Sequence, residues 1–291
     1  YDPATDTIFD SSTNTTYTVE NGQFVSEDGG ALVPGWRANV GLENYDRLVN
    51  DTQTRNVFFR VLVWTVVFSL FSVALSFGLG LLLALVFNDD RMFGRRWYRS
   101  LIIIPYAIPS FMTALVWRGM LNQQFGVINR WLGTNLAWLD GQWLPYFSIL
   151  LVNTWLGFPY MFLVCTGALQ GIPADLTEAA QVDGAGGFKA FRLITFPLLL
   201  VAVGPLLVAS FAFNFNNFNI IYLLTEGRPP VPGSDAGRTD ILISYVYKIA
   251  FAGGKGVDYG FAAAVSLVIF LIVATISAFS FRATRSLEEM R

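Results

Sequence analysis

The sequence has no histidine, a single cysteine and few charged residues. Without histidine, the chain lacks the commonest metal ligand and the commonest general base of enzymes. Its one cysteine, Cys165, cannot form an internal disulfide. Charged residues are 14 % of the 291 residues, below the roughly 25 % of soluble domains, whereas hydrophobic residues are 54 %. The net charge of −2 gives no indication of a nucleic-acid partner. The composition therefore favours a membrane protein.

Long apolar stretches make up much of the rest of the sequence. Each approaches the roughly 20 residues that a helix needs to cross the hydrocarbon core of a bilayer. We predict an all-α membrane protein in which residues 57–285 form the transmembrane domain. The predicted spans are residues 57–88, 100–119, 143–170, 193–225 and 259–281. Pro105 and Pro109 predict a kink in the second span.

The first 56 residues are polar and acidic, and we predict that they form an extracytoplasmic segment. Residues 12–30 alternate like a weak hairpin, and residues 35–55 are typical of a surface helix that leads into the first span. Two interpretations stay open, namely a small exposed lobe or partly disordered arm, and a docking surface for an extracytoplasmic partner. Because the chain starts at Tyr1 without methionine or a signal-like segment, we expect an upstream part to be missing.

Clusters of arginine indicate the direction of the spans. The short loop after the first span is rich in arginine, and such loops face the cytoplasm. These residues are Arg91, Arg95, Arg96 and Arg99. By alternation, the loop 171–192 and the tail 286–291 are also cytoplasmic. The loops 118–140 and 226–259 are then external, and the second begins with a turn-rich stretch that is followed by a predicted helix at the outer surface over 241–251.

The uncharged cores of the spans limit the possible mechanisms. They hold no Asp, Glu, Lys or Arg, although proton-coupled carriers and intramembrane enzymes need ionisable groups at that depth. The chain also lacks the G-x-x-x-x-G-K-[ST] phosphate loop, so any ATP must bind a separate subunit. We therefore expect no catalytic site, metal or cofactor on this chain.

Two polar stripes lie at mid-depth in the third and fourth predicted spans. Both follow the i, i+3, i+4, i+7 spacing of a single helix face. The stripes are Asn153, Leu156, Gly157, Tyr160 and Ser210, Phe213, Asn214, Asn217. At about 1.5 Å rise per residue they reach a similar depth, so they could face one cavity.

Such a cavity suits a neutral ligand that is rich in hydroxyl groups. Asparagine amides both donate and accept hydrogen bonds. Tyr160 and Phe213 offer flat apolar faces for a sugar ring, and Gly157 leaves room beside its helix. The alternative is that the asparagines join neighbouring helices and that the small residues allow close packing.

The loop between the third and fourth spans predicts two short helices. Pro173 suits a first turn, Asp175 and Glu178 lie near that positive end, and Gly184 suits the helix end. Leu176, Ala179, Ala180 and Val182 are expected to form a small apolar face. A lipid-surface helix is the alternative, but alanines and acids favour contact with a protein.

This loop resembles the EAA loop of permease subunits of ABC importers. The shared pattern is Glu-Ala-Ala from Glu178, then Gly184, Ile194 and Pro197, with Phe196 where the family often has leucine. The resemblance implies that the loop is a coupling helix that fits a cleft in an ATPase subunit. The residues that would face the ATPase are Glu178, Ala179, Ala180, Asp183 and Gly184.

From residue 35 onward the chain resembles the larger membrane subunit of maltose/maltodextrin importers, the MalF type, on the stretches "RSLIIIPYAIPSF", "LVNTWLGFPYMFL" and "SFAFNFNNF". The resemblance implies a type I, MetI-like permease core in a bacterial inner membrane. It also implies sugar contacts at Tyr106, Asn153, Leu156, Gly157, Tyr160, Ser210, Phe213, Asn214 and Asn217. Phe158 replaces a tyrosine often seen in the family, and residues 1–33 resemble a remnant of a larger external domain.

The partners implied are a second, MalG-like permease, a MalK-like ATPase dimer that binds ATP and Mg, and a MalE-like extracytoplasmic sugar-binding protein. The chain would then form half of a pore for maltose and maltodextrins. Trehalose or another α-glucoside is the alternative cargo. An ion-coupled sugar transporter, a membrane enzyme and a structural scaffold are the alternative classes of protein.

Overall fold

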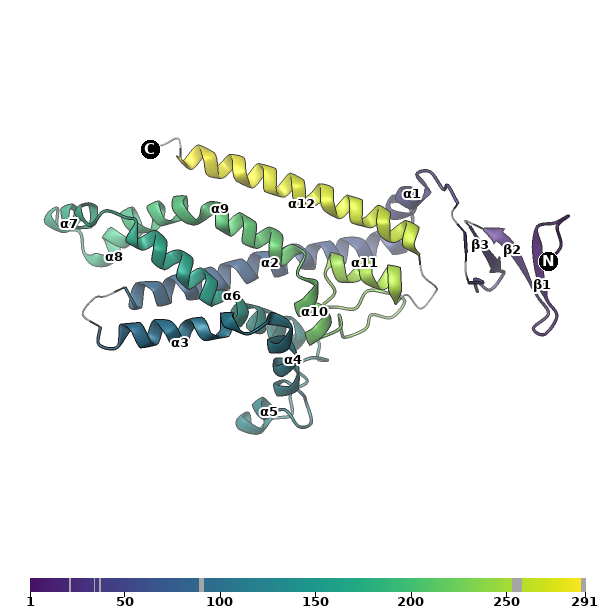
Figure 1. Ribbon diagram of the computed structural model, residues 1–291, viewed down its shortest axis with the longest axis horizontal. Helices are drawn as coiled ribbons and strands as arrows, with labels where there is room; N and C mark the ends of the chain where they lie inside the picture. The colour runs from purple at the N-terminus through teal and green to yellow at the C-terminus, as the bar shows by residue number, and fades with distance from the viewer. Residues whose placement is uncertain (21, 34, 37, 89–91, 253–257, 289–291) are drawn as a thin grey trace.

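The computed structural model describes residues 1–20, 22–33, 35–36, 38–88, 92–252 and 258–288. They form an elongated bundle of helices with a small antiparallel sheet beyond one end (Figure 1). The sheet contains β1 (Thr7–Asp10), β2 (Thr15–Glu20) and β3 (Gln23–Ser26) in that order. The predicted hairpin is therefore a three-stranded meander. The short helix α1 (Glu43–Asn50) leads from it into the bundle.

Within the described residues, four helical segments are long and apolar enough to cross a membrane. They are α2 (Thr52–Val86), α6 (Leu144–Gln170), the continuous segment Gly187–Phe215, and Tyr259–Ser280 of α12 (Tyr259–Glu288). A fifth candidate is the pair α3 (Arg95–Ala107) and α4 (Ser110–Met120), bent by 91°. The prediction of an all-helical membrane fold is confirmed.

The bend between α3 and α4 falls where the sequence predicted a kink. Pro105 lies inside α3, and Pro109 immediately precedes α4. A proline disfavours the helical conformation of the residue before it, and Ile108 is extended at φ −87° and ψ 131°. The two helices are therefore nearly perpendicular, and α4 leads the short α5 (Val127–Leu132) away from the bundle axis (Figure 1).

Close packing against α2 fixes the position of α6. A Cβ atom on Gly80 would lie 2.7 Å from the Met161 Cβ, so a larger residue would force the helices apart. A Cβ atom on Gly157 would likewise lie 2.7 Å from the Ser76 Oγ. The expectation that Gly157 leaves room for a ligand is therefore wrong, because Ser76 of α2 occupies that space.

The fourth segment differs from the single helix predicted over residues 193–225. A short π-helix, η1 (Phe191–Thr195), continues into α9 (Phe196–Phe215), which ends before a separate α10 (Phe218–Leu224). The break lies at Asn216 and Asn217, whose backbones leave the helical region. Asparagine amides bond nearby backbone carbonyls and so compete with the helix. Two amides do so here, because Asn214 donates to the Ser210 carbonyl and Asn216 to that of Ala212.

Residues 225–241, which we call the return segment, join α10 to α11 (Leu242–Phe251). The sequence predicted an external turn-rich loop and then a helix over 241–251, and α11 confirms that helix. Part of the segment and much of α11 are buried, including Ala236, Asp240, Leu242 and Tyr245. Side chains of distant helices satisfy polar backbone groups of this segment, which local sequence does not reveal.

Candidate functional site

The amides of three asparagines meet where α6 crosses the end of α9. Asn153 of α6 donates to the Asn214 Oδ1 at 2.7 Å. Asn217, at the start of α10, donates to the Asn153 Oδ1 at 3.2 Å. Both polar atoms of the Asn153 amide are thus engaged, and the side chain is only 6 % exposed. We call these three residues the amide cluster.

The amide cluster is compatible with both roles that the sequence left open. Asn153 joins α6 to α9 and α10, as a packing residue would. Asn214 and Asn217 are only half-buried, and the helix break displaces Asn217 from the face that a continuous helix would give it. Because Asn153 restrains both neighbours, their remaining hydrogen-bonding capacity has a fixed direction.

The other residues of the two stripes are distributed around this cluster. Phe213 is 69 % exposed beside Asn214. Tyr160 stacks on Tyr106 of α3, with ring centroids 6.4 Å apart and planes at 25°. Leu156 packs against an apolar cluster that includes Phe68 of α2. The structure therefore brings Tyr106 and Tyr160 together, whereas Leu156 and Gly157 contribute to helix packing.

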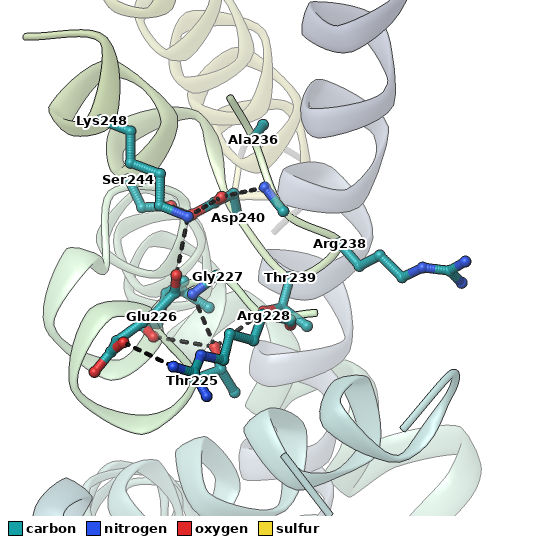
Figure 2. Close-up of polar contacts among 12 residues, drawn as sticks. Thr225, Glu226, Gly227, Arg228, Ala236, Arg238, Thr239, Asp240, Ser244 and Lys248 are labelled. Atoms are coloured by element: carbon teal, nitrogen blue, oxygen red, sulfur yellow. Dashed lines mark hydrogen bonds and ion pairs between the residues drawn. The ribbon is translucent and has the colours of Figure 1, made fainter. Parts of the chain in front are cut away.

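A buried ion pair holds the return segment on α11, and sequence reasoning missed it. Asp240 has no exposed side-chain surface, and its Oδ2 lies 2.6 Å from the Lys248 Nζ (Figure 2). The same carboxylate accepts from Ser244 and from the backbone N–H of Gly237. Lys248 also donates to the Glu226 carbonyl. A fully satisfied buried pair of this kind restricts the segment to one conformation.

Side chains of α2 and α6 complete the attachment of the return segment. Arg60 donates to the Ala236 carbonyl, and Trp64 to that of Thr239. Tyr146 of α6 donates to the Arg238 carbonyl. The Arg238 side chain itself extends away from the polar contacts of the return segment (Figure 2). Polar residues near the start of an apolar helix were the only sequence signal for these contacts.

The predicted coupling loop folds as α7 (Ala174–Val182) and α8 (Gly187–Ala190). Gly184 is left-handed at φ +79°, and the N–H groups of Gly184 and Ala185 donate to the Gln181 and Ala180 carbonyls. This is the Schellman pattern that the glycine predicted. The Glu178, Ala179 and Asp183 side chains are exposed, whereas Ala180 is buried against its own chain.

The expected apolar face of α7 is left largely uncovered by the rest of the described chain. Val182 is 87 % exposed, and Leu176 and Phe188 are also exposed. Among the described side chains of α7, Ala180 alone is buried. The loop forms a small projection at one end of the bundle (Figure 1). Apolar and acidic side chains are exposed on it. We call residues 174–190 the knob.

Curated relatives resemble the chain over most of its length. It is 45 % identical over 291 residues to a protein of Photorhabdus laumondii named maltose/maltodextrin transport system permease protein MalF, covering 98 % of this chain and 55 % of that protein. It is 45 % identical over 272 residues to the protein of the same name from Vibrio parahaemolyticus, covering 91 % of this chain and 51 % of the relative. The chain thus spans about half the length of the curated relatives it matches.

Solved structures share the fold at low sequence identity. A bacterial ABC transporter involved in the import of alginate matches with a TM-score of 0.71 at 23 % identity, covering 85 % of this chain and 84 % of the other. The MetNI methionine ABC transporter matches with a TM-score of 0.58 at 16 % identity, covering 81 % of this chain and 98 % of the other. These similarities support the predicted type I permease core.

The family model supplies the assignment for most of the helical bundle. It covers residues 76–288, which include the end of α2, the amide cluster, the knob and α12. The chain belongs to the family of binding-protein-dependent transport system inner membrane components.

Proposed function

We propose that this chain is a membrane-spanning subunit of an ATP-driven importer and forms half of the path for maltose and maltodextrins. The cargo is inferred from relatives at 45 % identity that carry that name. The uncharged amide cluster is compatible with a neutral sugar, since amides pair with hydroxyl groups as donors and as acceptors.

In this proposal the sugar lies against the free side of the amide cluster. Asn214 and Asn217 bond its hydroxyl groups, and Asn153 holds both amides in place from behind. The exposed Phe213 ring and the Tyr106–Tyr160 pair provide apolar faces near the cluster. The backbone carbonyl of Ser210 accepts a hydrogen bond from the Asn214 amide and so fixes the Asn214 rotamer. Leu156 and Gly157 set the spacing of α6 rather than contact the sugar.

The proposed partners follow from the family and from the knob. A binding-protein-dependent system requires an extracytoplasmic sugar-binding protein. We add a second, similar permease and an ATPase dimer, on which ATP and Mg would bind and be hydrolysed; this chain would carry out no catalysis. One solved alginate transporter was determined in complex with an alginate pentasaccharide-bound periplasmic protein, which is a precedent for such an assembly.

The arginine distribution gives the proposed orientation in the bacterial inner membrane. Arg95, Arg96 and Arg99 at the start of α3 would lie in the cytoplasm. The knob and the C-terminus would lie on the same side, and the β1–β3 sheet outside. Figure 1 agrees with this grouping, because the start of α3, α7 and the C-terminus lie at one end and the sheet beyond the other.

One observation carries the proposed coupling. An uninterrupted helical segment, Gly187–Phe215, starts in the knob and ends beside the amide cluster. A helix transmits displacement along its axis, so closure of the ATPase dimer on the knob would move Asn214 relative to Asn153. A two-state change of this kind needs only a partner that binds the two states with different affinity.

The decisive experiment measures ATPase activity of the purified transporter with binding protein loaded with different sugars. We expect maltose and maltotriose to stimulate hydrolysis, and the amide variant Asn214→Ala to reduce that stimulation. Stimulation by trehalose or another sugar alone would contradict the proposed cargo. Uptake that persists without ATPase subunits but stops with an uncoupler would contradict the proposed class of transporter.

A further inference from the structure

Five aromatic rings follow one another from the amide cluster towards the end of the bundle opposite the knob. They are Phe218 and Tyr222 of α10, Tyr247 and Phe251 of α11, and Tyr259 at the start of α12. Successive centroids lie 4.9, 5.2, 5.3 and 5.8 Å apart, so each ring touches the next. We call this set the aromatic ladder.

The ladder begins at the amide cluster itself. Phe218 directly follows Asn217 in the chain, and its ring also lies 4.9 Å from that of Tyr247. Figure 1 shows α10 near the middle of the bundle and α11 between it and the end where α12 begins. The ladder therefore connects the depth of the amide cluster with the end that we propose to be extracytoplasmic.

Exposure distinguishes the ladder from a structural core. None of its five rings is buried; Phe251 and Tyr259 are 61 % and 63 % exposed. A core aromatic cluster of this size would bury about 150–250 Å² for each ring. The chain instead leaves ring surface available along the whole series, and the true core residues of α11, such as Leu242 and Ile249, face the other way into α2 and α12.

The direction of the ladder also distinguishes it from an aromatic belt. Belt residues gather at one depth around a membrane protein, at the level of the lipid headgroups. The ladder extends between depths, because Phe218, Tyr222 and Tyr247 contact one another and Phe251 and Tyr259 continue the series from Tyr247. Its rings carry no charge, and Tyr222, Tyr247 and Tyr259 each add a phenol hydroxyl. The apolar faces and a few hydroxyl groups match the alternating C–H faces and hydroxyl groups of a carbohydrate chain.

We propose that the aromatic ladder is a second carbohydrate subsite, which holds the trailing glucosyl units of a linear oligosaccharide whose leading unit lies at the amide cluster. This inference rests on the proposed function and extends it to cargo length. One glucosyl unit cannot contact five successive rings, so the ladder is selective for longer chains. Maltose engages the amide cluster with little help from the ladder.

The test compares a short and a long sugar in the complete reconstituted transporter. Uptake of maltose and of maltohexaose is measured at saturating, sugar-loaded binding protein for wild type, Tyr247→Leu and Phe251→Leu. We expect maltohexaose uptake to fall roughly tenfold in the leucine variants, and maltose uptake to stay within about twofold of wild type. Tyr247→Phe, which keeps the ring, should retain most of the maltohexaose uptake.

A matched control separates the ladder from general aromatic surface. Phe270 of α12 is exposed to a similar extent but belongs to no ring contact among the described residues. Phe270→Leu should leave the ratio of the two uptake rates unchanged. An equal loss for both sugars in Tyr247→Leu and Phe251→Leu, or no loss for either, would contradict the subsite. If wild type fails to import maltose at all, the proposed function itself is wrong.

Discussion

The two ends of the bundle hold their irregular segments in different ways. At one end, the return segment is attached through Asp240 and Lys248 and through hydrogen bonds from α2 and α6. At the other end, the knob has two buried side chains, Ala180 and Ala190, while Val182 and Phe188 project from its surface. Both segments are polar and rich in turns, so composition alone would not separate them.

This difference shows which end needs a partner. The return segment satisfies its carbonyl groups within the chain, and a segment so restrained is complete on its own. The knob presents apolar and acidic side chains together, which is typical of a surface that another protein covers. The first end should therefore depend on this chain for its structure, and the second on the ATPase subunit that we propose as its partner.

The largest effect is expected at the return segment. Asp240→Ala leaves Lys248 without its partner in a largely buried site, which should cost about 3–5 kcal/mol of unfolding free energy. Unfolding of the purified chain in mixed micelles would measure it. The control Asp235→Ala removes an exposed acid of the same segment and should have little effect. Equal stability of the two variants would show that the pair does not hold the segment.

Charge reversal in the knob should affect transport and leave folding unchanged. We expect Glu178→Lys to lower sugar uptake roughly thirtyfold, because a reversed charge at an interface costs about 2 kcal/mol or more. The unfolding free energy should match wild type, since the Glu178 side chain is exposed. Glu27→Lys in the N-terminal sheet region serves as a control of equal charge change. Normal uptake by Glu178→Lys would contradict the proposed contact between the knob and the ATPase.

Between the two ends, substitutions in the amide cluster should affect sugar-stimulated ATP hydrolysis. Asn214→Ala is expected to reduce sugar-stimulated ATP hydrolysis about tenfold, because it removes one hydrogen-bonded amide and releases Asn153. Asn216→Ala is the matched control, since Asn216 is exposed and its side chain donates to the Ala212 carbonyl of the preceding helix rather than to Asn153. Similar losses in both variants would indicate a general effect on the helix break.

The smallest effect is expected at the surface of the return segment. Glu226 pairs with Arg118 at 2.7 Å and with Arg228 at 3.8 Å, but all three side chains are well exposed. Exposed pairs contribute about 0–1 kcal/mol and weaken in salt. Glu226→Gln should therefore change the unfolding free energy by less than about 1 kcal/mol, and only at low ionic strength. A large loss at high salt would mean that this network, too, supports the fold.

The sequence predicted those features that depend on neighbouring residues. Gly184 indicated the end of α7 because glycine adopts the left-handed conformation readily. Pro105 and Pro109 indicated the bend because proline restricts its own backbone and that of the preceding residue. Long uncharged stretches indicated the spans, since the bilayer requires a minimum apolar length.

Features that depend on distant residues could not be predicted in this way. Asp240 follows a turn-rich stretch, and nothing local showed that its carboxylate would be buried against Lys248. The break at Asn216 was missed because the asparagines also fit a helical stripe, and the bond from Asn217 to Asn153 favours the broken form. The packing of Gly157 against Ser76 was also missed, because the two residues lie on different helices.

Hydrogen–deuterium exchange tests the contrast between the two ends most directly. The assembled transporter would be compared with the same transporter from which the ATPase subunits have been removed. We predict that amides of residues 174–190 exchange much faster after removal, whereas those of residues 225–251 keep their protection. Unchanged exchange in the knob, or a loss of protection in the return segment, would contradict the account.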